Sequence, residues 1–540
     1  MGGHDARRSP LALLAAGLIF LALPAPPVAA QDPADADPGV PLGLAEALRT
    51  ALANNLDLVI ARRDPQIAEA GIDVQKAAFD PVLGVTAEFA RNDVDETISY
   101  STLVDDEIVV VEEDDDSTTD SPLVGVSWAQ SLKFGGRYDV TVRALESDTS
   151  PSIGFDQTTG FIVQSDPLYQ QGSLALNFEM PLLRGFGTEV TTADIVLARS
   201  GLEISQEDLR LQAQSTLQSV ENAYWDLLAS IEALRVARES LSLAQDLLAL
   251  NRKKVEVATL APIEITQAEA GGASREESVI LAETAVENAE DELRQLLAVP
   301  KGDPSWFRRI VPTDRPEYRE MDLDSDALLA KALERRPEIV TARKRLQDAE
   351  LSERVAKNAV KHDLTLGASV GPTRSDYDVR LSYINQDLLP QDAKTTMDEL
   401  DWRIGLTYGI PVFNRAAKAN YAVATLNREK SELGVQSVEQ TIRVDVRRAV
   451  RSVDSGVKRV AAARANTVLQ RRTLEAEQKK FDNGMSTSFE VLQIQTDLLN
   501  AQVAEIRAIL DYTKALADLE RAKGTLLEAR GLALADAGRR

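Results

Sequence analysis

The side chains of this sequence that could do chemistry are carboxylates rather than nucleophiles or metal ligands. Cysteine is absent and only two histidines occur, His4 and His362, which leaves little basis for thiol chemistry, Cys-based metal binding or His-dependent catalysis. The sequence shows neither a Ser/His/Asp arrangement nor a Walker motif. The net charge of −25 argues against a nucleic-acid partner, because no broad basic surface can neutralise phosphates. We therefore predict no catalytic residue, no cofactor and no metal site.

Two acidic residues stand out because they occupy equivalent positions. Glu264 is the centre of Ile-Glu-Ile at 263–265, and Glu490 is the centre of Phe-Glu-Val at 489–491. Each follows a short turn between two long helical stretches. Carboxylates held close together repel one another and attract cations, with a strength that salt reduces. The alternative interpretation is that each is a solvated residue on a helix surface.

The elements that position these residues are duplicated within the chain. Residues 51–62 match residues 332–343 at an offset of 281, and the match continues to Leu83 and Leu364, where strand-like runs begin. Similarity at a fixed offset indicates repeated structural units. Each half reads as helix, strands, long helix, turn and long helix.

The long helices are predicted from heptads. A seven-residue repeat runs from Val220 through Leu227 and Leu234, and a second begins at Val446 and extends to Phe481. This period keeps one seam of a helix facing a partner helix and favours left-handed supercoiling, although an ordinary antiparallel coiled coil has the same pattern. The predicted long helices cover about residues 188–258, 262–298, 415–482 and 487–528.

Shorter segments between the helices alternate apolar and small or polar residues with period two. Trp402, Ile404 and Leu406 are typical of this pattern, which favours strands with one lipid-facing side in an outer-membrane barrel. A half-buried sheet in a soluble periplasmic protein is the alternative. The predicted strands cover about residues 82–91, 122–132, 137–145, 172–180, 362–371 and 401–411, and the polar stretches 92–121, 148–170 and 372–400 are predicted to be extracellular loops.

The predicted strands require several copies of the chain. One chain offers four to six, and the pattern leaves open whether the first repeat supplies two or four of them. Closed membrane barrels begin at about eight strands, and an open edge in lipid leaves backbone groups unpaired at several kcal/mol each. The predicted fold is therefore mainly α with a β-barrel portion, in which duplicated antiparallel coiled-coil helices form an α-barrel tunnel and the strands contribute to a shared barrel.

The N-terminus is typical of an exported protein. Arg7 and Arg8 precede an apolar run, Leu11–Leu23, which ends in small residues before Gln31. A membrane anchor is the alternative, but the run is short for a bilayer span. The predicted organisation is a signal peptide at 1–30, a first repeat at 31–300, an equatorial linker at 301–325, a second repeat at 326–530 and a tail at 531–540.

Taken together, these features resemble the TolC-like family of outer-membrane efflux and secretion channels. The resemblance covers about residues 42–530 and rests on the duplication, the junctions 180–187 and 409–414, and the turns 255–264 and 481–490. It implies a homotrimer that shares twelve barrel strands in the outer membrane, above a helical tunnel that tapers to a tip in the periplasm. It also implies a periplasmic adaptor, an inner-membrane transporter and outer-membrane lipid as partners.

The resemblance assigns roles to residues of the tip. Two acidic positions that line the aperture in the best-known member fall on Glu490 and Gln493, so one of the two charges is missing, and Glu264 matches a further acidic position. An arginine of that member's closing network falls on Ser486, which puts the same polar lock in doubt. The turns on which an adaptor would dock contain Ala258, Thr259, Leu260, Asn483, Gly484, Met485 and Ser486.

The function predicted from the resemblance is an exit duct that passively conducts substrates to the exterior, for efflux or type I secretion. The alternative is a periplasmic adaptor with coiled-coil hairpins. An adaptor would carry one hairpin between lipoyl-like half motifs and would lack a second repeat with its own strands. An exported hydrolase on a helical scaffold is a third possibility, and it lacks a catalytic constellation in the sequence.

Overall fold

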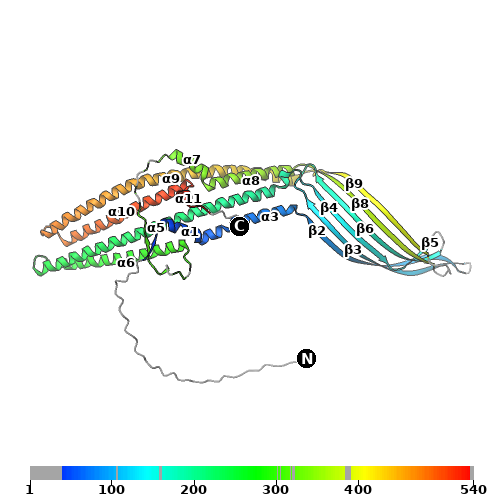
Figure 1. The fold of residues 1–540 in the computed structure, drawn as a ribbon, viewed down its shortest axis with the longest axis horizontal. Helices are drawn as coiled ribbons and strands as arrows, with labels where there is room; N and C mark the ends of the chain where they lie inside the picture. The colour runs from blue at the N-terminus through cyan, green and yellow to red at the C-terminus, as the bar shows by residue number, and fades with distance from the viewer. Residues whose placement is uncertain are drawn as a thin grey trace, which may run out of the picture.

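The computed structural model describes residues 39–104, 107–156, 161–300, 302–303, 306–316, 318, 321, 323–383 and 391–534. The predicted signal peptide and most of the predicted tail lie outside these residues. The described chain is elongated, with long helices at one end and a sheet at the other (Figure 1). None of the described helices combines the length and the apolarity that crossing a membrane requires.

The helices follow the duplicated order of the sequence. In the first repeat they are α1 (Leu44–Asn54), α2 (Leu56–Ala61), α3 (Arg63–Lys76), α4 (Thr188–Thr191), α5 (Ala193–Glu256) and α6 (Ile263–Leu297). In the second repeat they are α7 (Ser325–Arg335), α8 (Pro337–Ala359), α9 (Arg415–Asp482), α10 (Ser488–Ala522) and α11 (Leu526–Ala529). The predicted end of the last long helix at 528 is wrong. The chain turns at Gly524, which has φ +73 and lies so close to the backbone of Arg335 and Arg336 that no side chain fits there without a shift.

The heptad seams are the buried centres of two helical hairpins, α5 with α6 and α9 with α10. Leu227 and Leu234 are 0% and 3% exposed, and Val446 is fully buried. Small seam residues bring the backbones close: a Cβ on Gly456 would lie 3.2 Å from the ring of Tyr512. Burial of this apolar stripe, more than helix propensity, stabilises helices of such length.

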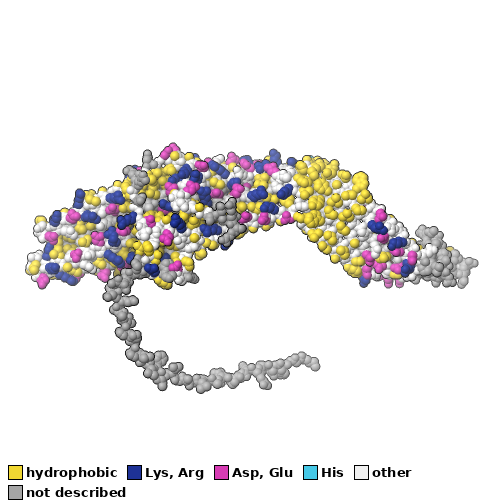
Figure 2. All heavy atoms as spheres, in the orientation of Figure 1, with side chains coloured by type: hydrophobic (Ala, Val, Ile, Leu, Met, Phe, Trp, Pro, Cys, Tyr) yellow, Lys and Arg dark blue, Asp and Glu magenta, His cyan; other side chains and the backbone are white. Residues whose placement is uncertain are grey.

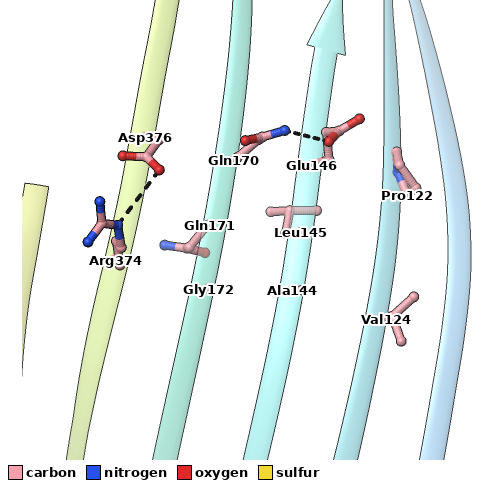
Figure 3. A pocket seen from close by; sticks show the side chains of 10 residues that line it. All are labelled: Pro122, Val124, Ala144, Leu145, Glu146, Gln170, Gln171, Gly172, Arg374 and Asp376. Carbon is pink, nitrogen blue, oxygen red and sulfur yellow. Dashed lines mark hydrogen bonds and ion pairs between the residues drawn. The ribbon is translucent and has the colours of Figure 1, made fainter. Parts of the chain in front are cut away.

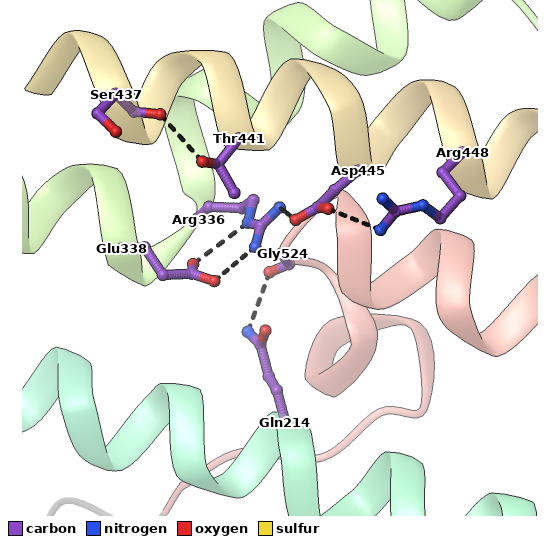
Figure 4. A network of polar contacts seen from close by, with 8 residues as sticks. All are labelled: Gln214, Arg336, Glu338, Ser437, Thr441, Asp445, Arg448 and Gly524. Carbon is purple, nitrogen blue, oxygen red and sulfur yellow. Dashed lines mark hydrogen bonds and ion pairs between the residues drawn. The ribbon is translucent and has the colours of Figure 1, made fainter.

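A buried polar network joins the helices of the second repeat (Figure 4). Arg336, just before α8, donates to Glu338 Oε1 at 2.6 Å and to Asp445 Oδ2 on α9 at 3.2 Å. Burial alone would lower the pKa of Arg336, but hydrogen bonds to the two carboxylates outweigh it and raise the pKa. The arginine therefore stays charged and fixes the angle at which α8 meets α9.

The middle of the molecule is held by a small equatorial assembly. Strand β1 (Val40–Leu42) pairs in parallel with β7 (Ile310–Pro312), and Tyr224 of α5 donates to Asp314 Oδ2 at 2.8 Å beside them. Burial raises the pKa of Tyr224 to about 12, so its hydroxyl remains a donor. These contacts tie the N-terminal segment and the linker to the centre of α5.

The sheet is antiparallel, in the order β2-β3-β4-β6-β8-β9, with the short β5 also paired to β6. Its strands are β2 (Val82–Val104), β3 (Glu107–Ser131), β4 (Arg137–Thr149), β5 (Ser152–Asp156), β6 (Phe161–Pro181), β8 (Asp363–Tyr383) and β9 (Gln391–Gly409). The first repeat thus fills four places in the sheet and the second fills two. One chain supplies six places, whereas the twelve-stranded trimer implied by the resemblance needs four.

The prediction of long polar loops at 92–121, 148–170 and 372–400 is wrong, because the strands continue through most of these residues. Polar side chains bond across the strands there. Arg91 Nη2 donates to Asp120 Oδ2 at 2.7 Å, and Thr97 Oγ1 donates to Asp114 Oδ1 at 3.0 Å. Cross-strand pairs of this kind stabilise a ladder without an apolar face, so polar composition alone did not indicate a loop.

An apolar band covers the half of the sheet nearest the helices (Figure 2). Its exposed residues include Leu83, Val85, Phe89, Val124, Val126, Trp128, Val142, Leu174, Leu176, Val370, Trp402, Ile404 and Leu406. A hollow of about 440 Å³ lies at its outer border, beside the small residues Ala144 and Gly172. There Gln170 bonds to Glu146, and Arg374 pairs with Asp376 (Figure 3). Charged side chains thus begin where the apolar band ends.

The seam yields a direct test. We expect Leu234→Asp to destabilise the protein by on the order of 4 kcal/mol, because it removes buried apolar contacts and leaves a buried carboxylate without a partner. Glu239→Ala is the matched control: its side chain is 55% exposed and only pairs with Arg235 on the same helix. Thermal unfolding followed by circular dichroism measures both. Equal effects of the two changes would contradict the assignment of Leu234 to the buried seam.

Candidate functional site at the helical tip

The two long hairpins end side by side at the end of the molecule opposite the sheet (Figure 1). Their turns have the same geometry. Thr259 N donates to Lys254 O at 2.8 Å, and Met485 N donates to Lys480 O at 2.9 Å. This is the bond that closes a helix with a left-handed residue at its end. That residue is Ala258 (φ 60) in the first turn and Gly484 (φ 74) in the second.

Glu490 has a local role that the sequence prediction did not include. Thr487 caps α10, and its hydroxyl accepts a hydrogen bond from Glu490 N at 3.3 Å. The Glu490 carboxylate in turn accepts from Thr487 N at 3.3 Å, which completes a capping box. Glu490 is exposed and close to the positive end of the helix dipole, where negative charge is stabilised. It is therefore a fixed carboxylate rather than a freely moving one.

Ser486 lies between two carboxylates. Its Oγ is 2.6 Å from Glu477 Oε1 on α9 and 2.7 Å from Glu490 Oε2 on α10. The hydrogen bond from the Ser486 hydroxyl, which donates to one carboxylate at a time, is the main reason that the pKa of each carboxyl is lowered; the Thr487 backbone N–H is a further donor for Glu490, and Lys480 is a further donor for Glu477. Both groups therefore keep their negative charge to a lower pH than an ordinary glutamate.

Gln493 is one turn further along α10, on the same face as Glu490. It is exposed, and its Nε2 donates to Asp497 Oδ1 at 3.3 Å. Asp497 was missed by sequence reasoning, although a spacing of seven from Glu490 places both on one face of a helix. The face thus carries two carboxylates with the amide of Gln493 between them.

Glu264 connects the two turns to each other. Its Oε2 accepts a hydrogen bond from Ser488 N at 3.0 Å, at the start of α10. Its backbone carbonyl accepts from Asn251 Nδ2 at 3.1 Å, and the same amide donates to Ser488 Oγ at 2.7 Å. Asn251 and Ser488 are fully buried. The carboxylate of Glu264 is thus used within the chain, as a contact between the hairpins.

Two cations strengthen the same junction. Lys254 Nζ donates to Phe481 O at 3.2 Å and lies 4.2 Å from the centre of the Phe481 ring. Arg275 of α6 is 7% exposed and donates to Leu492 O at 3.3 Å and to the Thr496 hydroxyl. Burial lowers the pKa of Arg275. The two hairpins are therefore joined by directed polar contacts as well as by apolar packing.

The outer surface of each turn carries apolar side chains. Val257 and Ile263 are 68% and 59% exposed in the first turn, and Met485 and Phe489 are 70% and 62% exposed in the second. Asn483 is bonded within its own turn, with Nδ2 donating to Lys479 O at 2.7 Å, and Leu260 packs against the tip core. Exposed apolar residues grouped at one end indicate an interaction surface.

The structure brings the predicted tip residues together in two groups. Glu490, Gln493 and Ser486 lie on the second hairpin, and Glu264 reaches from the first hairpin to the second. Sequence reasoning missed Asn251, Ser488, Glu477, Asp497 and Lys254. The heptad phase places Asn251 on the seam of its helix, and the spacing of seven places Asp497 on the same face as Glu490. The arrangement can fix a negative charge at the end of the second hairpin and control how firmly the hairpins hold together.

The comparisons with known proteins identify the family. The chain matches the outer membrane efflux protein family over residues 147–299 and 328–525, which is more than half of its length. It therefore belongs to that family. Its fold is similar to that of the CmeC outer membrane channel of Campylobacter jejuni, with a TM-score of 0.61, 17% identity and coverage of 89% of this chain and 86% of that one. The family places the chain in the outer membrane.

Individual relatives are distant. The pyoverdine export outer membrane protein OpmQ of Pseudomonas aeruginosa is 24% identical over 332 residues, which are 61% of this chain and 65% of that protein. The outer membrane protein TolC of Vibrio cholerae is 22% identical over 419 residues, 74% of this chain and 88% of that one. The match to OpmQ thus spans just under two thirds of its length.

The tip predicts a pH effect. We expect Ser486→Ala to raise the pKa of Glu477 and Glu490 towards the ordinary value of about 4.3. A lowered carboxyl pKa stabilises the fold above the unfolded pKa, and this contribution is lost as pH falls through the folded pKa. The wild type should therefore be more stable than the variant at neutral pH, and the difference should disappear as pH falls through the lowered carboxyl pKa, as measured by thermal unfolding at a series of pH values. Ser455→Ala is the control, because the hydroxyl of Ser455 bonds to its own helix. If Ser486→Ala has the same thermal unfolding midpoint as the wild type at neutral pH, the role assigned to Ser486 is wrong.

Proposed function

We propose that the chain is one subunit of a homotrimeric exit duct, which conducts substrates passively from the periplasm through the outer membrane. The observation that carries the proposal is the sheet. It has a continuous apolar band on one face, and among the described strands β2 and β9 form its two edges, each paired on one side only. Unpaired backbone groups cannot remain in lipid, so other copies must complete the barrel. The helical hairpins then extend as a tunnel into the periplasm.

The proposed partners meet the duct at its tip. The exposed apolar residues of the two turns suit a periplasmic adaptor, because a docking surface combines apolar anchors with a polar rim. The adaptor would connect the duct to an inner-membrane transporter that supplies the energy. The name of one relative refers to pyoverdine export, and small exported molecules of that kind are one proposed cargo class. A periplasmic adaptor remains the alternative function, but a sheet with a lipid-compatible face does not suit it.

The selectivity of the duct is proposed to lie in Glu490. Three copies around a common axis would form a ring of carboxylates, followed along the tunnel by Gln493 and Asp497. Their negative charge favours cations in a narrow opening. The contacts of Glu264, Asn251 and Lys254 with the second hairpin hold the tip in its present form. Opening requires these contacts to be exchanged or strained.

The proposed function is tested by the state of the protein in the cell. We expect the mature protein to fractionate with the outer membrane and to be purified in detergent as a trimer. The physical reason is the open sheet, which needs both lipid and neighbouring copies. Membrane fractionation followed by light scattering of the purified complex measures this. A monodisperse monomer in buffer without detergent would rule the proposal out.

The charge ring makes a separate prediction. In planar bilayers at low salt, Glu490→Gln should lower the cation-to-anion permeability ratio roughly two- to five-fold, because three charges leave the aperture. Gln493→Asp should raise the ratio and strengthen block by multivalent cations. Glu490→Asp is the matched control, since it retains the charge. If selectivity is the same in all three variants, the constriction lies elsewhere in the tunnel.

A further inference from the structure

The sheet contains one hairpin more than the duct needs in order to connect its helices. Strand β2 leads from α3 and β6 leads into α4 and α5, so a single hairpin of β2 and β6 would complete the first repeat. Between them the chain inserts β3 and β4, joined by a short turn at 132–136. The second repeat has no such insertion, because β8 and β9 follow each other directly in the chain. The first repeat therefore contributes twice as many places to the sheet.

The inserted turn is built into the junction between sheet and helices. Gly187 N, just before α4, donates to Phe134 O at 3.2 Å, and the hydroxyl of Thr191 donates to Lys133 O. Gly135 has φ +103, and a Cβ there would lie 2.6 Å from the carbonyl of Gly185. The close packing requires a glycine at this position. The hairpin is thus anchored at the level where β6 becomes helix.

The apolar band runs through the inserted strands without a break. Val126 and Val142 are direct cross-strand partners, as are Val142 and Leu174. These side chains are on the same face as Val85 of β2 and Leu406 of β9. A strand outside the membrane would not need an apolar residue at every second position. All six places therefore belong to the membrane-embedded wall.

The register of the sheet fixes how two copies can join. One row of directly paired residues crosses all six strands: Leu83, Trp128, Val140, Leu176, Val370 and Trp402. The row begins one residue from the start of β2 at Val82 and ends seven residues before the end of β9 at Gly409. The row therefore rises by six residues over the five steps from β2 to β9, and pairing the next β2 at the same height as β9 makes this six residues for six strands. A climb of one residue per strand is the ratio found in closed barrels whose strands tilt by about 36°.

We propose that β2 of one subunit pairs antiparallel with β9 of the next, with Val85 opposite Leu406, and that three copies close an eighteen-stranded barrel. This inference rests on the proposed trimer and concerns how its wall is closed. Because the rise is an even number of residues, apolar side chains stay on the lipid face at each junction between subunits. Strands about 4.8 Å apart at this tilt give a wall roughly 110 Å around and about 35 Å across. Barrels of this strand number enclose an aqueous channel, so the tip is the narrow part of the duct.

Disulfide cross-linking tests the pairing of β2 with β9 of the next subunit directly, because the chain has no cysteine of its own. The double variant Val85→Cys with Leu406→Cys should form covalent trimers on non-reducing gels, since cross-strand partners lie within disulfide range. Val85→Cys with Trp402→Cys is the matched control. It uses the same two strands and the same face, but its residues are four positions out of register, and it should remain uncross-linked.

The competing arrangement has a signature of its own. If β4 were the edge, cysteine at Val140 or Val142 would cross-link to cysteine at Leu406, and the barrel would have twelve strands. That result, or a count of twelve strands in an electron-microscopy map of the wild-type trimer, would overturn the inference and leave the proposed function intact. A count of eighteen supports it even if the disulfide forms poorly. A protein absent from the outer membrane would instead contradict the proposed function itself.

Discussion

The backbone hydrogen bonds at the edges of the sheet are the constraint on which the rest of this structure depends. β2 and β9 each expose a full ladder of N–H and C=O groups along the apolar band, and lipid offers these groups no partner. In the proposed duct, neighbouring copies would satisfy them. Closure would also fix the number of helical hairpins that meet at the tip, because each subunit brings two. The architecture of the proposed tunnel is in this sense a consequence of the barrel.

The long helices keep the same packing along most of their length, because each hairpin has a narrow and regular apolar core. Apolar seam residues such as Leu234 and Val446 are buried within each hairpin, while directed contacts such as Arg336 with Asp445 set the angle between neighbouring helices. A heptad seam tolerates small shifts along the helix, whereas a buried ion pair does not.

The tip itself combines a fixed charge with a polar contact between the two hairpins. Glu490 is held by its capping box and by Ser486, so its charge does not depend on movement of the hairpins. Glu264, Asn251 and Ser488 form the contact between the hairpins. A hydrogen bond contributes about 1 kcal/mol net, but Asn251 and Ser488 are fully buried, so breaking this contact would also leave buried polar groups unpaired at about 1–3 kcal/mol each. In the proposed duct, selectivity and opening would thus depend on different residues.

The sequence by itself determined the duplication, the heptad helices, the alternating strands and the position of both turns, because these depend on periodicity within one segment. It did not determine that the polar stretch 92–121 is mostly strand, since cross-strand partners such as Arg91 and Asp120 are visible only when the register is known. The tertiary structure alone decided the contacts of Glu264 with the second hairpin. It also decided that the first repeat fills four places in the sheet, because pairing between distant segments is a property of the folded chain.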